Sequence, residues 1–547
     1  MTTLAATVLA LSACKAQGPK VGSHQESRTA KRLASKKPSA STKNAARPAK
    51  KAWDKDLVRD LGTWRKEWLA PGASVVVVDK AKTLLEAGVG LKDLSKSESV
   101  GPDTSFPIAS NSKTFTAAAV ALLAERGKLR LDDPVTKHLP EFTLGDPEWA
   151  KRVTIRDLLA HRSGLPAHAV DRFYMPMLMS GQKCTSDKLA AFMKTVKPGH
   201  PIRSKAAYSN LAYMVMADLI AKVSGATWAE FVTAEFIKPL GLTGTVVGRD
   251  AFVALKNRVA PHDIDPEGKH VAIELMDFGV CGRGTSAMFS SARDLGVWMR
   301  LFLNGGKHDG KAVLSEETVA ELLRPHTLKH PGKVLSKLAQ SDFAAHTLGW
   351  ESVQHKGLTV VRMGGSGPGY QSGLFLLPRQ GKAFAVLQNI GGNGFYVFTA
   401  FTLLDRIANL EPTDWAAIFR KFFPLPPAHE ARPLDAAKLD DYVGSYATAK
   451  GYPRLVERDG DKLYMRGKSA IGTGPPMHGK ARLFGLAKAE GDVMFIRTSD
   501  AVFTFRRDDK GAVTGFTEKT AAATHEFTRA QAPAGGKSGD KDAKKSQ

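Results

Sequence analysis

Cysteine is scarce in this chain, and its scarcity excludes one common kind of site. Only Cys14, Cys184 and Cys281 occur among 547 residues. No two of them have the close spacing of a zinc-binding pair, so we expect no metal site. Cys184 and Cys281 could form one disulfide in an oxidising compartment. Two buried free thiols are the alternative that the sequence leaves open.

Long hydrophobic runs are also missing. The apolar run 4–13 is too short to span a bilayer, but it has the length of the hydrophobic part of a signal peptide. It ends in small residues before Cys14, which resembles a bacterial lipoprotein signal with Cys14 as the lipidated N-terminus. No Lys or Arg precedes the run, so an apolar N-terminus without an export role is the alternative. We predict a signal over 1–14, export to the periplasm or cell envelope, and membrane attachment through Cys14.

Acidic residues are outnumbered, 54 against 78 Lys and Arg, which gives a net charge of +24. The excess is concentrated in the flanks: residues 15–51 hold 11 Lys or Arg and one acid, Glu26. Such segments lack the apolar residues needed to fold, so we predict a basic disordered linker over 15–52 and a disordered tail over 531–547. The linker resting on lipid headgroups or wall polymers is the alternative. No nucleic-acid partner is expected.

Apolar patterning predicts two folded regions. The run 73–79 is typical of a buried strand, with 84–91 as its hairpin partner, and 110–126 is typical of a helix that ends at Gly127. Further helices are predicted at 154–161, 210–224, 228–236, 291–303 and 315–323, and late strands at 359–363, 371–377 and 383–389. Strands at both ends with helices between them predict one sheet surrounded by helices over 53–423. A Pro-rich linker, 424–436, then leads to short alternating strands over 437–530, predicted to be a small all-β domain.

Ser110 and Lys113 are the first candidate catalytic residues. They lie three apart at the start of a predicted helix, so they share one face. A serine hydroxyl needs a base at neutral pH, and a lysine can serve if its surroundings lower its pKa. This is the Ser-x-x-Lys pattern. A helix cap at Ser110 and a surface cation at Lys113 are the structural alternative.

Two later segments supply further candidates. Tyr208 could shuttle a proton and Asn210 could bind a substrate amide, unless they only pack and cap the following helix. The glycines of the segment Met363-Gly-Gly-Ser366 allow close approach of substrate to the backbone, where an N–H could help to form an oxyanion hole. We therefore predict substrate-binding roles for Gly364, Gly365 and Ser366, with an ordinary turn as the alternative.

These segments together resemble the serine β-lactamase-related family, which includes class C β-lactamases, D,D-carboxypeptidases, D-aminopeptidases and related esterases. The likeness extends over about residues 56–408 and includes the segments Asp103–Phe106, Gly127–Pro134, Thr154–Pro166 and Ser290–Leu295. It implies an α+β fold, an antiparallel sheet flanked by helices. It also implies attack by Ser110 on an acyl carbon, proton transfer by Lys113 and Tyr208, positioning by Asn210, and an oxyanion hole from the N–H groups of Ser110 and Ser366. Neither a metal nor an organic cofactor is implied. The segment from Leu439 resembles the β-domain often appended to such hydrolases.

One position departs from the family. Met363 stands where relatives have Lys or His, and alternation along a strand directs the neighbouring Arg362 to the opposite face. Without this cation, a neutral ester or amide is favoured as substrate over carboxylate-bearing β-lactams or D-Ala-D-Ala ends. The substrate could be a small molecule or a peptidoglycan fragment. A catalytically weak wall- or ligand-binding protein is the alternative, and a scaffold that works through its tails is a third hypothesis. His161 and His168 are predicted to be structural, and the spacing of His355 gives no support for a base.

Overall fold

The structure is a computed structural model. It describes residues 53–143, 145–167, 169–170, 173, 184–265, 269–423, 430–449, 453–466, 481–487, 489, 491–496, 501–519 and 524–530. The predicted signal with Cys14, the basic linker, the C-terminal tail and His168 lie outside the described residues.

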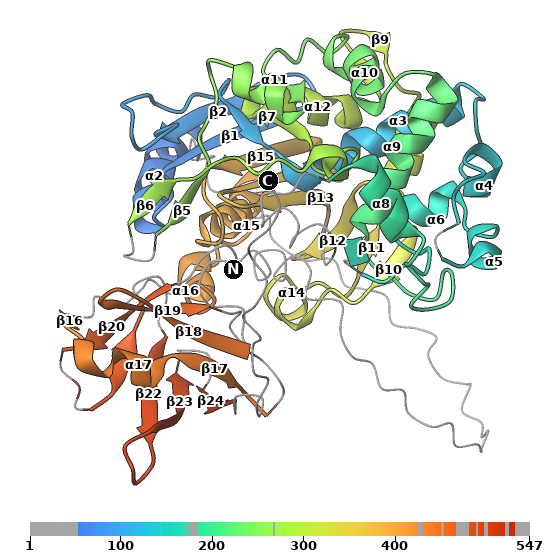
Figure 1. Ribbon diagram of the computed structural model, residues 1–547. Helices are drawn as coiled ribbons and strands as arrows, with labels where there is room; N and C mark the ends of the chain where they lie inside the picture. The colour runs from blue at the N-terminus through green and yellow to red at the C-terminus, as the bar shows by residue number, and fades with distance from the viewer. Residues whose placement is uncertain are drawn as a thin grey trace, which may run out of the picture.

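An eight-stranded antiparallel sheet forms the centre of the larger domain (Figure 1). The first strand of the chain pairs with the last strand of the domain, Ala73–Asp79 running antiparallel to Lys382–Gln388, and the second strand pairs with the first, so both ends of the domain contribute to one sheet, as the sequence predicts. In spatial order the strands are β10 (Thr327–Lys329), β11 (Ala344–His346), β12 (Glu351–His355), β13 (Leu358–Gly367), β14 (Tyr370–Leu377), β15 (Lys382–Gln388), β1 (Gly72–Asp79) and β2 (Thr83–Gly90).

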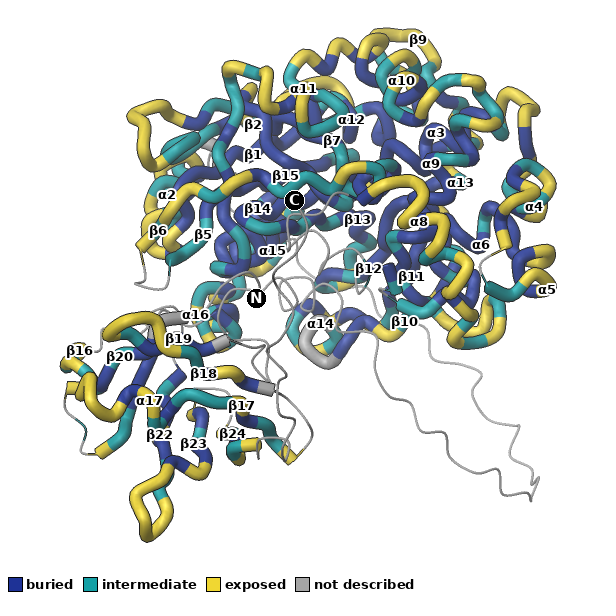
Figure 2. The backbone as a smooth tube through the Cα atoms, viewed as in Figure 1, coloured by how far each residue is buried: buried dark blue, intermediate teal, exposed yellow. Residues whose placement is uncertain are grey.

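Helices cover both faces of this sheet, and the central strands β14, β15 and β1 are buried between them (Figure 2). Alternation along β1 sends Val76 and Val78 into one core and Val75 and Val77 into the other. The first core holds α3 (Ser112–Glu125), α6 (Ile155–Leu159), α9 (Asn210–Ser224), α10 (Trp228–Val232), α12 (Ala292–Leu303) and α13 (Glu316–Leu323). The second core holds α2 (Trp53–Glu67), α15 (Phe395–Ile407) and α16 (Trp415–Arg420).

Most predicted helices are present with altered ends. α9 has the predicted bounds, because the Ser209 side chain caps its first turn and Gly225 ends it in the left-handed conformation. The structural alternative for Asn210, that it caps this helix, is therefore wrong by one residue. The helix predicted over 228–236 changes at Thr233 into a π-helical turn, η2 (Thr233–Ile237). β13 extends to Gly367, four residues past its predicted end, so the glycines lie within the strand.

Short elements complete the larger domain. The additional helices are α4 (Val135–His138), α5 (Pro147–Ala150), α8 (Ser186–Met193), α11 (Arg249–Ala254) and α14 (Lys333–Leu338). The small sheets are β3 (Ser105–Pro107), β7 (Met288–Ser291) and β4 (Val246–Val247); β5 (His262–Ile264) and β6 (His270–Ala272); and β8 (Lys307–His308) and β9 (Lys311–Ala312). Short 3₁₀ turns are η1 (Ala109–Asn111), η3 (Gly279–Gly282), η4 (Pro378–Gln380) and η5 (Ala436–Lys438).

The C-terminal region is an antiparallel β-barrel with a core of its own, which confirms the predicted all-β fold. Its strands are β16 (Ala431–Arg432), β17 (Gly444–Ala447), β18 (Pro453–Asp459), β19 (Lys462–Arg466), β20 (Ala481–Leu486), β21 (Val493–Phe495), β22 (Val502–Arg507), β23 (Val513–Lys519) and β24 (Thr524–Arg529), after the short helix α17 (Leu439–Tyr442). The ring closes because β21 pairs with both β22 and β20, which leaves β16 beside β20.

Candidate active site

A tight turn presents Ser110 at the start of α3. The residues 109–111 form the 3₁₀ turn η1, which continues into α3 at Ser112, so Ser110 and Lys113 lie about one turn apart on the same side. Ala109 has a φ of +45°, a left-handed conformation that costs a non-glycine residue about 1–3 kcal/mol. The Ser112 hydroxyl holds the turn by donating to the Ala109 carbonyl at 2.7 Å.

The hydroxyl oxygen of Ser110 is the meeting point of two other side chains. Lys113 Nζ and Tyr208 Oη each donate a hydrogen bond to Ser110 Oγ, and both distances are 3.0 Å. Lys113 is fully buried, and its Nζ also donates to the Thr285 carbonyl at 3.3 Å and lies 5.0 Å from the centre of the Tyr208 ring. The structure therefore brings the three predicted catalytic residues together at Ser110 Oγ.

The strand β13 passes close behind this turn, and Gly365 makes that approach possible. A Cβ at Gly365 would lie closer to the Ile108 carbonyl oxygen than van der Waals contact allows, and only 2.6 Å from Ser372 Oγ, so no larger residue fits. Ser372 Oγ donates to Ile108 O at 2.8 Å and accepts from Asn111 Nδ2 at 2.7 Å, which joins β14 to the turn.

The C-terminal part of β13 has a described neighbouring strand on one side only. β12 pairs with β13 only as far as Arg362, so the stretch from Met363 to Gly367 has β14 on one side and no described strand on the other. Alternate backbone N–H groups of such a stretch point to the open side. Gly364 and Ser366 belong to this stretch, and Gly364 pairs with Gly373 across β14.

Tyr208 and Asn210 come from the segment that enters α9. Ser209 caps the helix, Tyr208 precedes the cap and Asn210 is the first helical residue. Tyr208 is half-buried and packs against the first core. Asn210 is also half-buried, and its place two residues after Tyr208 puts it at the same end of α9.

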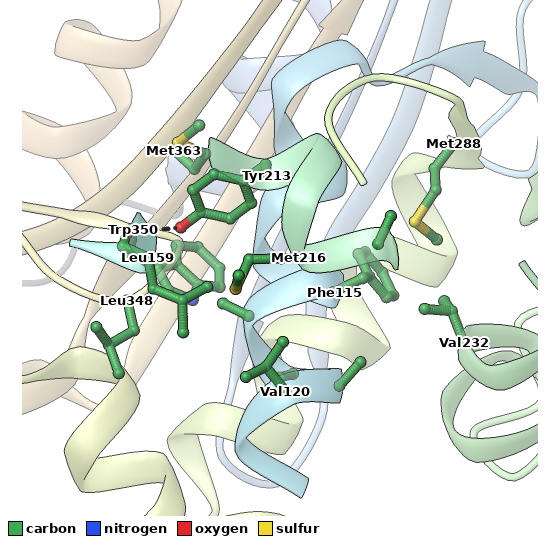
Figure 3. Packing of buried hydrophobic residues seen from close by; sticks show 14 of the residues in the cluster. Phe115, Val120, Leu159, Tyr213, Met216, Val232, Met288, Leu348, Trp350 and Met363 are labelled. Carbon is green, nitrogen blue, oxygen red and sulfur yellow. Dashed lines mark hydrogen bonds between the residues drawn. The ribbon is translucent and has the colours of Figure 1, made fainter. Parts of the chain in front are cut away.

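Met363, at the position where relatives have a cation, is an apolar residue of the first core. Its side chain is 9% exposed and belongs to the same buried cluster as Tyr213 and Trp350 (Figure 3). The neighbouring Arg362 pairs across β14 with Phe375, a residue of the opposite core, and forms an ion pair with Glu351 at 2.7 Å. Arg362 therefore does not replace the missing cation, as alternation predicted.

The structure also places two cysteines and two histidines whose roles the sequence did not settle. Cys184 and Cys281 form a disulfide with their Cα atoms 5.8 Å apart, which decides against free thiols. His355 is buried against the second core and bonds Asp405 at 2.8 Å, so it lies on the far face of the sheet from Ser110. His161, in contrast, packs directly on the Tyr208 ring at 4.6 Å between centroids. Neither its spacing nor its chemistry alone indicated this contact.

Two negative findings apply to the described residues alone. There, no group of three or more His, Cys, Asp or Glu side chains is arranged to hold a metal ion. Among the same residues, no helix combines the length and the apolar character needed to cross a membrane.

Comparison with known protein families shows to which family the chain belongs. A family model described as Beta-lactamase matches residues 56–409, which include Ser110, Lys113, Tyr208 and the glycines of β13. The chain belongs to the beta-lactamase family. A second model, a domain of unknown function (DUF3471), matches residues 428–531 and thus the barrel.

Curated relatives extend over the same part of this beta-lactamase-family chain. Protein flp of Staphylococcus aureus (strain COL) is 26% identical over 331 residues, 60% of this chain and 61% of that protein. Unguisins hydrolase ungD of Aspergillus violaceofuscus (strain CBS 115571) is 26% identical over 348 residues, 59% of each protein. The matches therefore span about three fifths of the length of these relatives.

A solved structure supports the fold of this family member over a longer stretch. The octameric penicillin-binding protein homologue from Pyrococcus abyssi matches with a TM-score of 0.58 and 20% identity, covering 87% of this chain and 99% of that one. At this identity the likeness establishes the fold alone.

Proposed function

We propose that this member of the beta-lactamase family is an acyl-serine hydrolase with Ser110 as its nucleophile. The observation that carries the proposal is the contact of Lys113 Nζ and Tyr208 Oη with the same oxygen, Ser110 Oγ, at 3.0 Å each. A nucleophile within hydrogen-bond reach of a base is the signature of covalent catalysis. A curated relative that is named as a hydrolase supports the same reaction class.

The arrangement supports a two-step reaction. Whichever of Lys113 and Tyr208 is deprotonated takes the Ser110 proton as Oγ forms a bond to the acyl carbon of the substrate. The pair then passes that proton to the leaving group as the scissile bond breaks. Water next attacks the acyl-enzyme, gives its proton to the pair, and releases the acid while Oγ is reprotonated. The N–H groups of Ser110 and Ser366 are proposed to bind the oxyanion, and Asn210 the substrate amide.

The proposed substrate is a neutral ester or amide. Met363 carries no charge, and Arg362 is held on the other face by Glu351, so neither pairs with a substrate carboxylate. An apolar wall at Met363 favours an uncharged acyl or leaving group by the same argument.

Covalent labelling tests the proposal. A fluorophosphonate should add one adduct on Ser110, seen by peptide mass spectrometry, and S110A should take up none. Y208F should fold normally and label about 10²–10⁴-fold more slowly, the contribution of a positioned proton-transfer group. p-Nitrophenyl esters, D-amino-acid anilides and a chromogenic cephalosporin should then be compared. Cephalosporin turnover at the rate of a dedicated β-lactamase would contradict the neutral substrate.

Met363 also favours a second candidate, a catalytically weak binding protein on the same fold. That protein would bind a wall fragment or ligand, for example in a calorimetric titration, without covalent labelling of Ser110. Labelling of the wild type separates the two candidates, because the binding protein lacks a reactive serine.

We also propose an envelope location through a lipid on Cys14. Radioactive palmitate should label the protein made in a bacterial host, and C14S should abolish the label and release the protein from the membrane fraction. A signal without lipid would leave C14S and the wild type in the same fraction.

A further inference from the structure

His161 is the central ring of a buried cluster behind the proposed catalytic tyrosine. It is 4% exposed, and its ring lies 4.6 Å from Tyr208, 5.2 Å from Tyr213 and 4.8 Å from His346. His346 comes from β11, some 180 residues later, and is 7% exposed. The hydroxyl of Tyr208 donates to Ser110, so the ring that His161 contacts is the one that carries the proposed catalytic hydroxyl.

Backbone contacts fix the position of Tyr208 through the same histidine. The N–H of Ser209 donates to His161 Nδ1 at 3.2 Å, and the N–H of Ala207 donates to the His161 carbonyl at 2.8 Å. Both residues adjacent to Tyr208 are thus bonded to His161. Because Nδ1 accepts this hydrogen bond, the neutral ring carries its proton on Nε2.

The segment around His161 is held firmly. Asp157 of α6 has no exposed side-chain surface and forms ion pairs with Arg162 at 2.8 Å and with Arg203 at 2.7 Å. The pair with Arg203 holds the segment that leads to Tyr208 against α6. His161 itself has a φ of +53°, a left-handed conformation that His and Asn adopt more readily than most residues. The fold maintains an uncommon backbone conformation at the residue that contacts Tyr208.

We propose that His161 is a positioning residue for the reaction, acting through Tyr208, with His346 as the ring against which it rests. This inference rests on the proposed acyl-serine function. His161 holds the phenol at hydrogen-bond distance from Ser110 and requires an unprotonated Nδ1 to do so. Protonation of that nitrogen removes the acceptor for the Ser209 N–H and loosens the segment that carries Tyr208.

The test compares fluorophosphonate labelling rates of the wild type and H161N in the full-length protein. Asparagine tolerates the left-handed backbone and can still accept from the Ser209 N–H, but it has no ring to support Tyr208. The maximal labelling rate of H161N should fall about 10- to 100-fold, the effect of a displacement near 1 Å in a reacting group. The probe concentration at half-maximal rate should stay close to that of the wild type.

The pH dependence supplies a readout that a purely structural role would not change. The titratable groups facing His161 are Tyr208, Tyr213 and His346, with Lys329 beside His346 and Lys113 beyond the two tyrosine rings. All of these remain in H161N. Because the proposal makes protonation of His161 lower the labelling rate at acidic pH, the acidic side of the rate-against-pH curve should move in H161N.

H355N is the matched control, because His355 is equally buried but bonds Asp405 on the opposite face of the sheet. Its labelling rate should equal that of the wild type even if its melting temperature falls. H161Q gives a second variant if H161N does not melt cooperatively. A wild-type rate and an unmoved pH curve in a folded H161N or H161Q would overturn the positioning role alone. Absence of labelling in the wild type would overturn both proposals.

Discussion

Met363 faces the first core, on the same side of the sheet as Ser110, and its surroundings are apolar. Val361 and Leu374 share that face, and Met363 pairs directly with Leu374 across β14. An amine placed here would lose most of its hydration, which is costly unless a partner or a substrate carboxylate compensates for it. Met363 therefore suits the stability of the core, and it agrees with the uncharged substrate proposed above.

M363K should lower the stability of the protein and increase its selectivity for substrates that carry a carboxylate. The melting temperature should fall, because the ammonium would be buried at a position that is now 9% exposed. Cephalosporin hydrolysis relative to p-nitrophenyl ester hydrolysis should rise about tenfold, the effect of about 1.4 kcal/mol from one added ionic contact in the transition state. M363L, which conserves volume, should leave the ratio unchanged. An unchanged ratio in a folded M363K would show that this position does not select substrate charge.

At the scale of elements, the chain segment that leads from Arg203 to Tyr208 is held by the N-terminal turn of α6. Thr154 and Asp157 form a reciprocal capping box, and the same Asp157 carboxylate accepts from Arg162 and Arg203. Burial alone would raise the pKa of Asp157, but hydrogen bonds from Arg203, Arg162 and Thr154 outweigh it and hold the pKa below its usual value. One carboxylate thus stabilises a helix start and the segment that follows α8.

D157N should lower the free energy of unfolding at neutral pH by about 2 kcal/mol, since it breaks charged hydrogen bonds whose partners are partly exposed. The folded pKa is depressed, so the contribution of Asp157 is complete above its unfolded pKa of about 3.9 and is lost as the pH falls through the folded value. Urea melts between pH 3 and 7 should therefore show a constant gap between wild type and D157N above about pH 5, narrowing at lower pH. A gap that widens on acidification would contradict this assignment.

The elements that could be predicted are those with their own local signals. α9 was found from its apolar pattern between Ser209 and Gly225, and β1 from four consecutive valines. α15 was missed because 11 of its 13 residues are buried, so it lacks the polar face by which a helix is normally seen. The contact of Tyr208 with Ser110 followed from resemblance to a family, not from spacing. His161, just after α6, and His346, in β11, are 185 residues apart and meet only in the folded chain, so no local pattern connects them.

At the scale of the whole molecule, the beta-lactamase-family domain and the barrel have separate cores. The barrel cluster contains only residues from 434 to 527, and within the described residues its sheet shares no strand with the central sheet. The beta-lactamase-family domain, in contrast, is completed by α16 and Phe423, which pack on the second core. A cooperative unit should therefore end just after Phe423.

A chain that ends at Phe423 should fold and should label with fluorophosphonate at the rate of the full-length protein, because Ser110, Lys113, Tyr208 and β13 all keep their described contacts. A chain that ends at Leu410 is the matched control. It loses Trp415, Phe419 and Phe423 from the second core and should melt at a lower temperature. Thermal melts and labelling rates on the two truncations check both statements. If the chain ending at Phe423 melts cooperatively but labels slowly, a part of the chain after Phe423 contributes to the reaction, and this prediction fails.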